Sequence, residues 1–367
     1  MNAARGESWI EFPEVGPLLG MAVGDALGTT YEFARIDQPP YPILATGPAT
    51  DVVGGGPFGL TAGQITDDTQ MAICLARSLT EKREVDMLDL ATRYVAWYQH
   101  AFDVGNQTAS ALGRIQAGMP VAVAGRETWH VSGRRAAGNG SLMRTTPIGV
   151  FCARHLRDGQ LDGLVEASLT DSLITHADPR CAIACAAFNA AIACGVLAHA
   201  AEPRLRDRRE LARRQLELAR AAIPIGAAKL RELWSDNADD LALVDAAAED
   251  LARDLDAAAA DAPNLYASDL HLHRMAGFVR VAFRLAFWHL VHTASWRDAL
   301  VDVASRGGDA DTNAAITGAL LGARDGASAI PRAWIDRVLA VTQPGPAAWA
   351  EAHHPRHLLA LAAMLQG

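Results

Sequence analysis

Two short acidic segments that lie far apart in the chain have nearly the same residue order. The first is Thr66-Asp67-Asp68-Thr69, and the second is Gly307-Gly308-Asp309-Ala310-Asp311-Thr312-Asn313. Each runs directly into an alanine-rich apolar stretch, which predicts that both lie at the start of a helix. If the two helix starts meet, four carboxylates converge on one point and repel each other unless cations lie among them. The fold is then constrained to join two distant helix starts around positive charge.

The ligand chemistry of both segments favours a hard divalent cation. Aspartate and threonine oxygens with no soft ligand nearby select Mg²⁺, Mn²⁺ or Ca²⁺ over zinc or copper. Two segments with similar ligands indicate two ions, which in binuclear sites lie about 3.5–4 Å apart.

Helix capping is the alternative explanation for each segment taken alone. Threonine is a good N-cap, and aspartate in the first turn interacts favourably with the helix dipole. Capping needs only one side chain, however, whereas each segment supplies three or four oxygen ligands. The pair Gly307-Gly308 also lets the backbone turn sharply and approach a ligand closely. Both features favour the metal interpretation.

The rest of the chain predicts helix after helix. Half of the 367 residues are hydrophobic, and the excess is alanine and leucine rather than valine and isoleucine, which favours helix over sheet. Gly20, Gly24 and Gly28 recur every four residues in a helix expected over 17–33. Since glycine costs about 1 kcal/mol relative to alanine inside a helix, this spacing indicates close approach by another backbone. We expect a single all-helical domain over residues 1–367.

The proline- and glycine-rich residues 35–63 predict a long irregular loop, a kind of segment that is commonly functional. Short helices and loops are expected over 102–140, and an acidic, alanine-rich helix at the periphery over 236–261. The run over 181–201 is nearly uncharged and long enough for a membrane span, but alanine dominates it and two polar residues interrupt it. We expect a buried core helix there and no membrane association. The other expected helices are 68–82, 86–100, 160–176, 180–200, 207–236, 240–260, 269–293, 295–305, 312–324 and 333–341.

Charge and cysteine content exclude some classes of function. The net charge of −9 argues against a nucleic-acid surface, which needs clustered Lys and Arg, although it allows one small phosphorylated ligand. The five cysteines are odd in number and form neither a Cys-x-x-Cys pair nor a zinc pattern. No basic-then-apolar signal segment opens the chain. A cytoplasmic protein with reduced, buried thiols is expected.

Glu32 is a further candidate ligand or general base. It shares a helix face with Asp25 if the first helix continues that far, and an exposed acidic stripe is then the simpler explanation. Glu32 also stands where that helix should end, beside the glycine-rich loop. A carboxylate at such a boundary is well placed for metal binding or proton transfer.

Five motifs carry a resemblance when they are taken in order along the chain. They are Gly24-Asp25-Ala26-Leu27-Gly28 with Glu32, Gly63-Gln64-Ile65-Thr66-Asp67-Asp68-Thr69-Gln70-Met71, Gly138-Asn139-Gly140-Ser141-Leu142-Met143-Arg144, Thr175-His176-Ala177-Asp178-Pro179 and Gly307-Gly308-Asp309-Ala310-Asp311-Thr312. Together they resemble the ADP-ribosylglycohydrolase family, of the dinitrogenase-reductase-activating glycohydrolase type. The resemblance covers about residues 16–325.

The resemblance implies a compact, orthogonal, all-α bundle with two Mg²⁺ or Mn²⁺ ions in a central cleft. It also implies hydrolysis of the bond to C1″ of the distal ribose of ADP-ribose. Glu32 and Asp103 would be the catalytic carboxylates. The turn over 138–141 would offer backbone N–H groups to the diphosphate, and His176 would contact the ADP-ribose. By the same resemblance, the metal ligands would be Thr66, Asp67, Asp68, Asp309, Asp311 and Thr312; the turn residues are Gly138, Asn139, Gly140 and Ser141.

Two departures from the family pattern bear on substrate choice. Ile65 stands where the family often has an aromatic residue, and Asp178 stands where it often has a second histidine. Neither removes an expected metal ligand. The reaction is therefore better defined by the resemblance than the group to which ADP-ribose is attached.

The sequence thus predicts a metal-dependent hydrolase that releases ADP-ribose from a modified protein, with ADP-ribosyl-arginine ranked first. ADP-ribosyl-serine and small ADP-ribose derivatives are the other substrates considered. Two other classes stay open: a non-enzymatic, crystallin-like or ADP-ribose-binding member of the family, and a phosphohydrolase that uses its paired aspartates and Mg²⁺ for phosphoryl transfer.

Overall fold

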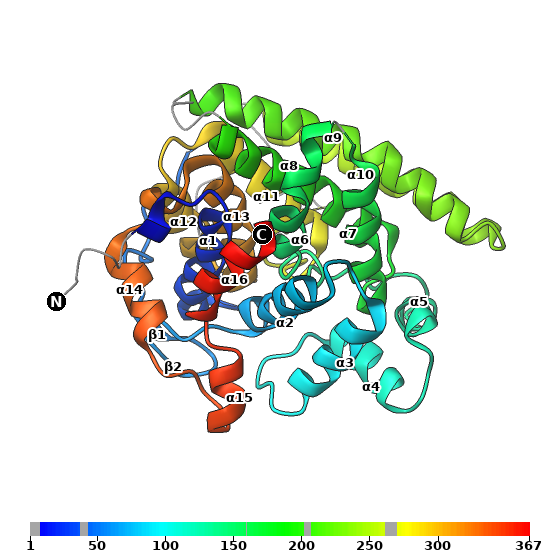
Figure 1. The fold of residues 1–367 in the computed structure, drawn as a ribbon, viewed down its shortest axis with the longest axis horizontal. Coiled ribbons are helices and arrows are strands. Elements are labelled where there is room, and N and C mark those ends of the chain that lie inside the picture. The colour runs from blue at the N-terminus through cyan, green and yellow to red at the C-terminus, as the bar shows by residue number, and fades with distance from the viewer. Residues whose placement is uncertain (1–7, 37–42, 159, 202–206, 261–269) are drawn as a thin grey trace.

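The computed structural model describes residues 8–36, 43–158, 160–201, 207–260 and 270–367. These residues form sixteen α-helices and one two-stranded hairpin, so the all-α prediction is confirmed (Figure 1). The hairpin pairs β1 (Gly54–Gly55) with β2 (Leu60–Thr61). The helices are α1 (Val15–Gly28), α2 (Asp67–Lys82), α3 (Met87–Tyr98), α4 (Asn106–Gln116), α5 (Val121–Val131), α6 (Thr146–Cys152), α7 (Asp162–Thr175), α8 (Pro179–Ala201), α9 (Arg208–Leu233), α10 (Ala238–Ala259), α11 (Val279–His292), α12 (Trp296–Ser305), α13 (Ala310–Asp325), α14 (Arg332–Ala340), α15 (Ala347–Ala352) and α16 (His357–Gln366).

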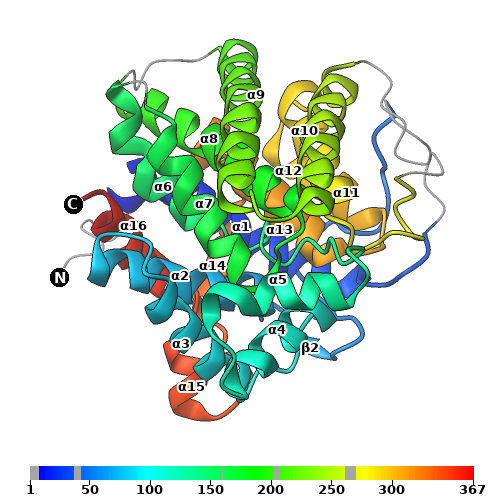
Figure 2. The same cartoon turned by 90° about the vertical axis from the view of Figure 1, so that its right-hand side faces the viewer.

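Helices α1 and α13 form the centre of the molecule and run antiparallel (Figures 1 and 2). A Cβ atom added at Gly20 would lie 2.1 Å from the carbonyl oxygen of Gly318, and one added at Gly28 would lie 2.3 Å from that of Ala310. Only glycine therefore allows this backbone contact, as its four-residue spacing predicts. The contact places the end of α1 beside the start of α13.

Helix α8 lies in the core, and its window over 179–200 is long and apolar enough to cross a membrane by length and composition. Most of that window, 83%, is buried inside the fold, which confirms the expected core helix. The long helices α9 and α10 lie side by side at one edge of the molecule (Figure 2), so the acidic helix expected over 236–261 is peripheral. All five cysteines are unpaired, and four of them are buried.

Two expected helix boundaries were wrong, and three helices were not expected. Helix α1 ends at Gly28 and is followed by a 3₁₀ turn, Thr29–Tyr31, so Asp25 and Glu32 do not share a helix face. Helix α11 begins at Val279, because the segment before it pairs instead with the turn over 137–139. Helix α6, in a stretch where no helix was expected, and helices α15 and α16, beyond the last expected helix, were missed. Residues 37–42 of the expected loop, and residue 269, lie outside the described ranges.

Candidate active site

The two acidic helix starts meet, and Asp25 of α1 fixes one of them. Its carboxylate is fully buried and accepts hydrogen bonds from the backbone N–H and the hydroxyl of both Thr66 and Thr69, with the shortest at 2.6 Å. The hydroxyl of Thr312 donates to Asp68 Oδ2 at 3.4 Å, which joins the start of α13 to that of α2. Because α1 packs along α13, one buried aspartate brings both acidic segments to the same point.

A cavity of about 370 Å³ opens over this junction. It is bounded by the starts of α2 and α13, the segment after α1, the loop before α4 and the turn over 138–140. Thr66 and Asp68 lie beneath the cavity and are fully buried. The expected site residues that line it are Glu32, Asp67, Asp103, Gly138, Asn139, Gly140, His176, Asp309, Asp311 and Thr312.

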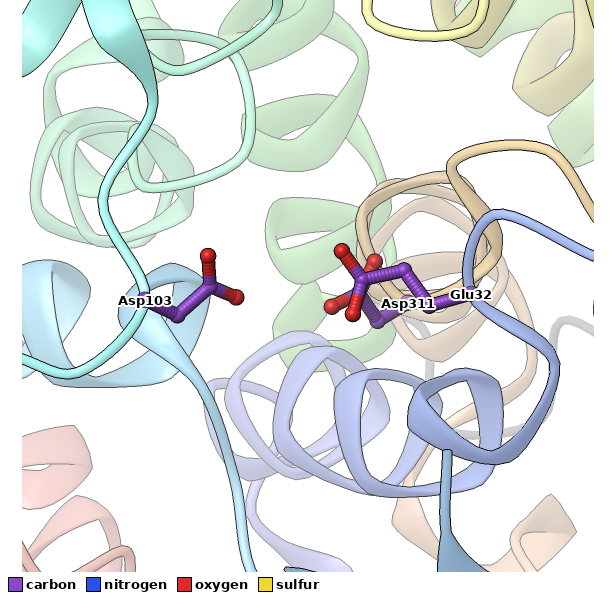
Figure 3. Close-up of side chains that lie close together, drawn as sticks. All are labelled: Glu32, Asp103 and Asp311. Carbon is purple, nitrogen blue, oxygen red and sulfur yellow. The ribbon is translucent and has the colours of Figure 1, made fainter. Parts of the chain in front are cut away.

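Three carboxylates from three different segments face one another in this cavity. Oxygens of Glu32, Asp103 and Asp311 all lie within 4.8 Å of one another. Glu32 and Asp311 approach from one side, and Asp103 approaches from the loop opposite (Figure 3). A small ligand between them would therefore meet carboxylates on two sides.

The turn over 138–141 forms another wall, and its first two backbone N–H groups are already hydrogen-bonded to other segments of the chain. Gly138 N–H donates to Gln107 Oε1 at 3.1 Å, and Asn139 N–H donates to the carbonyl of Gly277 at 3.0 Å. Within the described residues, no hydrogen bond engages the backbone N–H of Gly140 or Ser141. Only the second half of the turn therefore offers free backbone donors.

The side chains of Asn139 and Ser141 in this turn form hydrogen bonds with other segments of the chain. The amide of Asn139 donates to Asp309 Oδ2 at 2.8 Å and so links the turn to the start of α13. The hydroxyl of Ser141 is fully buried and hydrogen-bonds to Ser172 in α7 at 2.9 Å. Ser141 therefore lies outside the cavity wall, and only its backbone could serve a ligand.

His176 packs against the turn in a defined tautomer. A Cβ atom added at Gly140 would lie 2.8 Å from the imidazole Cε1, so the ring and the turn are in close contact. Arg144 donates to Thr175 Oγ1 at 2.9 Å, and that hydroxyl lies 2.8 Å from His176 Nδ1. The only acceptor for the threonine proton among the described residues is Nδ1, which assigns the hydrogen to Nε2. Burial and the Arg144 charge lower the pKa of His176 well below its usual value, so the ring is a neutral donor.

Burial and the neighbouring carboxylates disfavour the charged form of each carboxyl group, which raises its pKa. Burial, followed by the charges of Asp103 and Asp309, raises the pKa of Glu32 to about 9. Burial and neighbouring carboxylates likewise raise the pKa values of Asp67, Asp68 and Asp311 well above their usual range. The pKa of Asp103 rises to about 7, again first through burial. Such clustered shifts mark functional sites.

The residues present suit divalent cations. Among the described residues that line the cavity, none is Lys or Arg. Glu32 Oε2 and Asp68 Oδ1 are buried and accept no hydrogen bond from the described part of the chain, although buried acceptors are almost always paired. Every candidate ligand is an oxygen, as Mg²⁺ and Mn²⁺ prefer. A pair of such ions would balance the charge and engage the unpaired oxygens.

Comparison with known proteins adds a match over nearly the whole chain. The profile of the family described as ADP-ribosylglycohydrolase matches residues 15–364. The chain belongs to the ADP-ribosylglycohydrolase family. The family resemblance of the sequence motifs is thereby confirmed.

Two relatives with informative names align with most of this chain at 26% to 29% identity. The ADP-ribosylarginine hydrolase Tri1 of Pseudomonas putida (strain GB-1) is 29% identical over 332 residues, which cover 88% of this chain and 73% of that protein. The ADP-ribosyl-[dinitrogen reductase] glycohydrolase of Rhodospirillum rubrum is 26% identical over 337 residues, covering 88% of this chain and 89% of that protein. A solved ADP-ribosylglycohydrolase-related protein complex matches with a TM-score of 0.65 and 26% identity, over 97% of both chains.

The two departures from the family pattern lie outside the lining of the cavity. Ile65 is fully buried in the hydrophobic core. Asp178 is buried and accepts hydrogen bonds from Trp129 Nε1 at 3.0 Å and from the Arg180 guanidinium at 2.7 Å. Both positions therefore act through packing next to the site.

A larger cavity, of about 820 Å³, lies between the ends of α8, α11 and α13 and the start of α9. Its charged groups are mostly engaged: Arg208 and Arg324 both pair with Asp325, and His199 and His292 hydrogen-bond to backbone carbonyls. The smaller, carboxylate-lined cavity is therefore the better candidate for the family's chemistry.

Sequence reasoning missed two residues at the site. Asp25 belongs to one of the five motifs but has no predicted role, although its position between Gly24 and Gly28 in a closely packed helix indicates burial. Phe33 lines the cavity but belongs to no motif, and its position depends on a turn that the sequence did not show.

Proposed function

We propose that the protein hydrolyses the bond between C1″ of ADP-ribose and a protein side chain, with ADP-ribosyl-arginine as the first-ranked substrate. The observation that carries the proposal is the cavity in which Glu32, Asp103 and Asp311 face one another with no Lys or Arg among the described lining residues. The relative named as an ADP-ribosylarginine hydrolase supports the arginine linkage, and the one named as an ADP-ribosyl-[dinitrogen reductase] glycohydrolase supports a protein carrier. The free thiols fit a cytoplasmic location.

The metal-binding residues in this proposal are those of the two acidic helix starts. When bound, two divalent cations, Mg²⁺ or Mn²⁺, would orient the hydroxyls of the distal ribose and balance the clustered carboxylates. The residues proposed to hold them are Thr66, Asp67, Asp68, Asp309, Asp311 and Thr312.

The protein's own groups bind the diphosphate, stabilise the charge that develops on the sugar and accept a proton. The free N–H group of Gly140, which lines the cavity, donates to the diphosphate, and His176, held as the Nε2–H tautomer, adds a neutral donor at the same wall. Cleavage builds positive charge on the sugar, which the facing carboxylates stabilise. Glu32 or Asp103 accepts a proton from the attacking water. Water adds to C1″ and the side-chain nitrogen or oxygen leaves with a proton, giving ADP-ribose.

The test is a panel of protein substrates carrying ADP-ribose on arginine, serine or cysteine, each incubated with Mg²⁺ or Mn²⁺. We expect release of ADP-ribose from the arginine-linked substrate at the highest rate. Release of inorganic phosphate instead of ADP-ribose would identify a phosphohydrolase. Binding of ADP-ribose without turnover of any substrate would identify a non-enzymatic member of the family.

A further inference from the structure

The residue after Glu32 is an exposed phenylalanine in an unusual backbone conformation. Phe33 lines the cavity, yet 64% of its side chain is exposed, and its φ angle is +57°. A bulky residue with positive φ is an outlier that persists only where its surroundings impose it. Large apolar side chains at a ligand cavity that remain exposed can serve as anchors in a protein interface.

The second acidic segment imposes this conformation. Phe33 N–H donates to the carbonyl of Gly308 at 2.6 Å, and Gly308 N–H donates back to the carbonyl of Ala34 at 2.9 Å. The next pair, Arg35 and Gly307, continues this antiparallel bridge. The backbone of Phe33 is thus held against the segment that precedes Asp309, rather than carried on a free loop.

A second aromatic group stands beside the opposite carboxylate. Phe102 directly precedes Asp103, is 36% exposed, and packs edge-to-face on Phe58 with ring centroids 5.5 Å apart. Phe58 lies in the turn between β1 and β2. That hairpin is anchored beside the 3₁₀ turn before Glu32, since Thr30 Oγ1 donates to the carbonyl of Gly54 at 2.9 Å. Each catalytic candidate is therefore a chain neighbour of a phenylalanine: Phe33 follows Glu32 and lines the cavity, and Phe102 precedes Asp103.

We propose that Phe33, Phe58 and Phe102 form an aromatic rim that contacts the protein carrying the ADP-ribose rather than the ADP-ribose itself. The inference rests on the proposed function, because the scissile bond must lie between Glu32 and Asp103 for these rings to adjoin the leaving side chain. The diphosphate is assigned to the wall formed by Gly140 and His176. The aromatic rim is therefore available to contact apolar side chains of the ADP-ribosylated protein that flank the modified residue.

The experiment compares Phe33→Ala with wild type on two substrates that share the same bond. One is an arginine-ADP-ribosylated protein, and the other is free ADP-ribosyl-arginine. We expect KM for the protein substrate to rise about tenfold, as for an interface anchor. KM for the small substrate and inhibition by ADP-ribose should stay within about twofold of wild type. Phe33→Leu, which keeps an apolar side chain, should restore most of the lost affinity.

Phe12→Ala is the matched control, because Phe12 is 46% exposed and lies before α1, at the end of that helix away from the cavity. It should behave as wild type on both substrates. Equal loss on both substrates for Phe33→Ala would overturn the inference and assign the ring to ADP-ribose. No loss on either substrate would also overturn it. Failure of wild type to cleave either substrate would instead refute the proposed function.

Discussion

Buried aspartates in this molecule occur in two contrasting settings. Asp254 of α10 is fully buried and receives hydrogen bonds from Arg280 and Arg284 of α11. Burial alone would raise the pKa of Asp302, but hydrogen bonds from His289 and Arg306 have the larger effect and lower this pKa to about 2. In the cavity, by contrast, burial and neighbouring carboxylates raise the pKa values of Asp67 and Asp311 well above their usual range.

The difference indicates what the cavity requires. A buried carboxylate is tolerated when it is paired and hydrogen-bonded, and this fold supplies guanidinium groups at Asp171, Asp240, Asp254 and Asp302. No described lining residue supplies one in the cavity. The cavity carboxylates are therefore either protonated or balanced by bound cations, and we propose that divalent cations balance them in the active protein.

The largest expected effect is on turnover. Asp67→Asn or Asp309→Asn should lower kcat by more than about 100-fold, because each removes a charge from a set proposed to hold the metal ions, whose contribution is several kcal/mol. The rate of ADP-ribose release measures the effect, and circular dichroism checks that the fold persists. Asp336→Asn, which removes an exposed carboxylate on α14, should leave kcat unchanged. Full activity in both cavity variants would contradict the hypothesis that these aspartates hold metal ions needed for turnover.

A matched pair of substitutions should change stability in opposite directions. Asp254→Asn removes the buried carboxylate that Arg280 and Arg284 share, although Arg280 keeps its ion pair with Asp250, and should lower the free energy of unfolding by about 3 kcal/mol. Asp311→Asn relieves repulsion in the cavity and should raise the stability of the metal-free protein by about 1 kcal/mol. Chemical denaturation in excess chelator measures both. Loss of stability in both variants would show that the cavity carboxylates are balanced within the chain.

The pH dependence of stability gives a smaller effect. Glu32, with its pKa raised to about 9, keeps its proton in the folded, metal-free protein, whereas the unfolded chain loses it near the usual value of about 4.5. The stability that this proton confers is complete below the unfolded pKa and is lost as pH rises through the folded one. Between pH 7 and 9, metal-free protein should therefore lose up to about 1.4 kcal/mol per pH unit for each such group. Added Mn²⁺ should flatten the slope.

Denaturation curves at pH 7, 8 and 9 with and without chelator check this slope. Histidines with lowered pKa values, such as His176 and His289, destabilise the fold only below about pH 6.5 and do not contribute in this range. A metal-free protein whose stability rises between pH 7 and 9 would contradict the account of the cavity.

The sequence predicted the elements with strong local signals. Alanine-rich composition predicted the helices, and the spacing of Gly20 and Gly24 predicted the contact that α13 completes. The acidic segments predicted a shared site because carboxylates, threonines and helix starts are recognisable in a single chain. Each of these signals is carried by residues that lie close together in the sequence, even where the contact that it predicts joins distant segments.

What the sequence did not show depends on contacts between distant segments. The left-handed turn at Phe33 exists because Gly308 accepts its N–H, and the burial of Asp25 depends on hydrogen bonds from the start of α2. The late start of α11 follows from pairing of Gly277 with Asn139. Ser141 belongs to a turn motif, but only packing on α7 shows that its hydroxyl faces away from the cavity.

The central claim, that the cavity requires divalent cations, is tested most directly by activity and bound metal measured on the same sample. Chelator-stripped protein should release no ADP-ribose from an arginine-modified protein. Titration with Mn²⁺ should restore release in step with the binding of two ions per chain, counted by electron paramagnetic resonance. Full release of ADP-ribose by stripped protein in excess chelator, with no bound metal, would contradict the account.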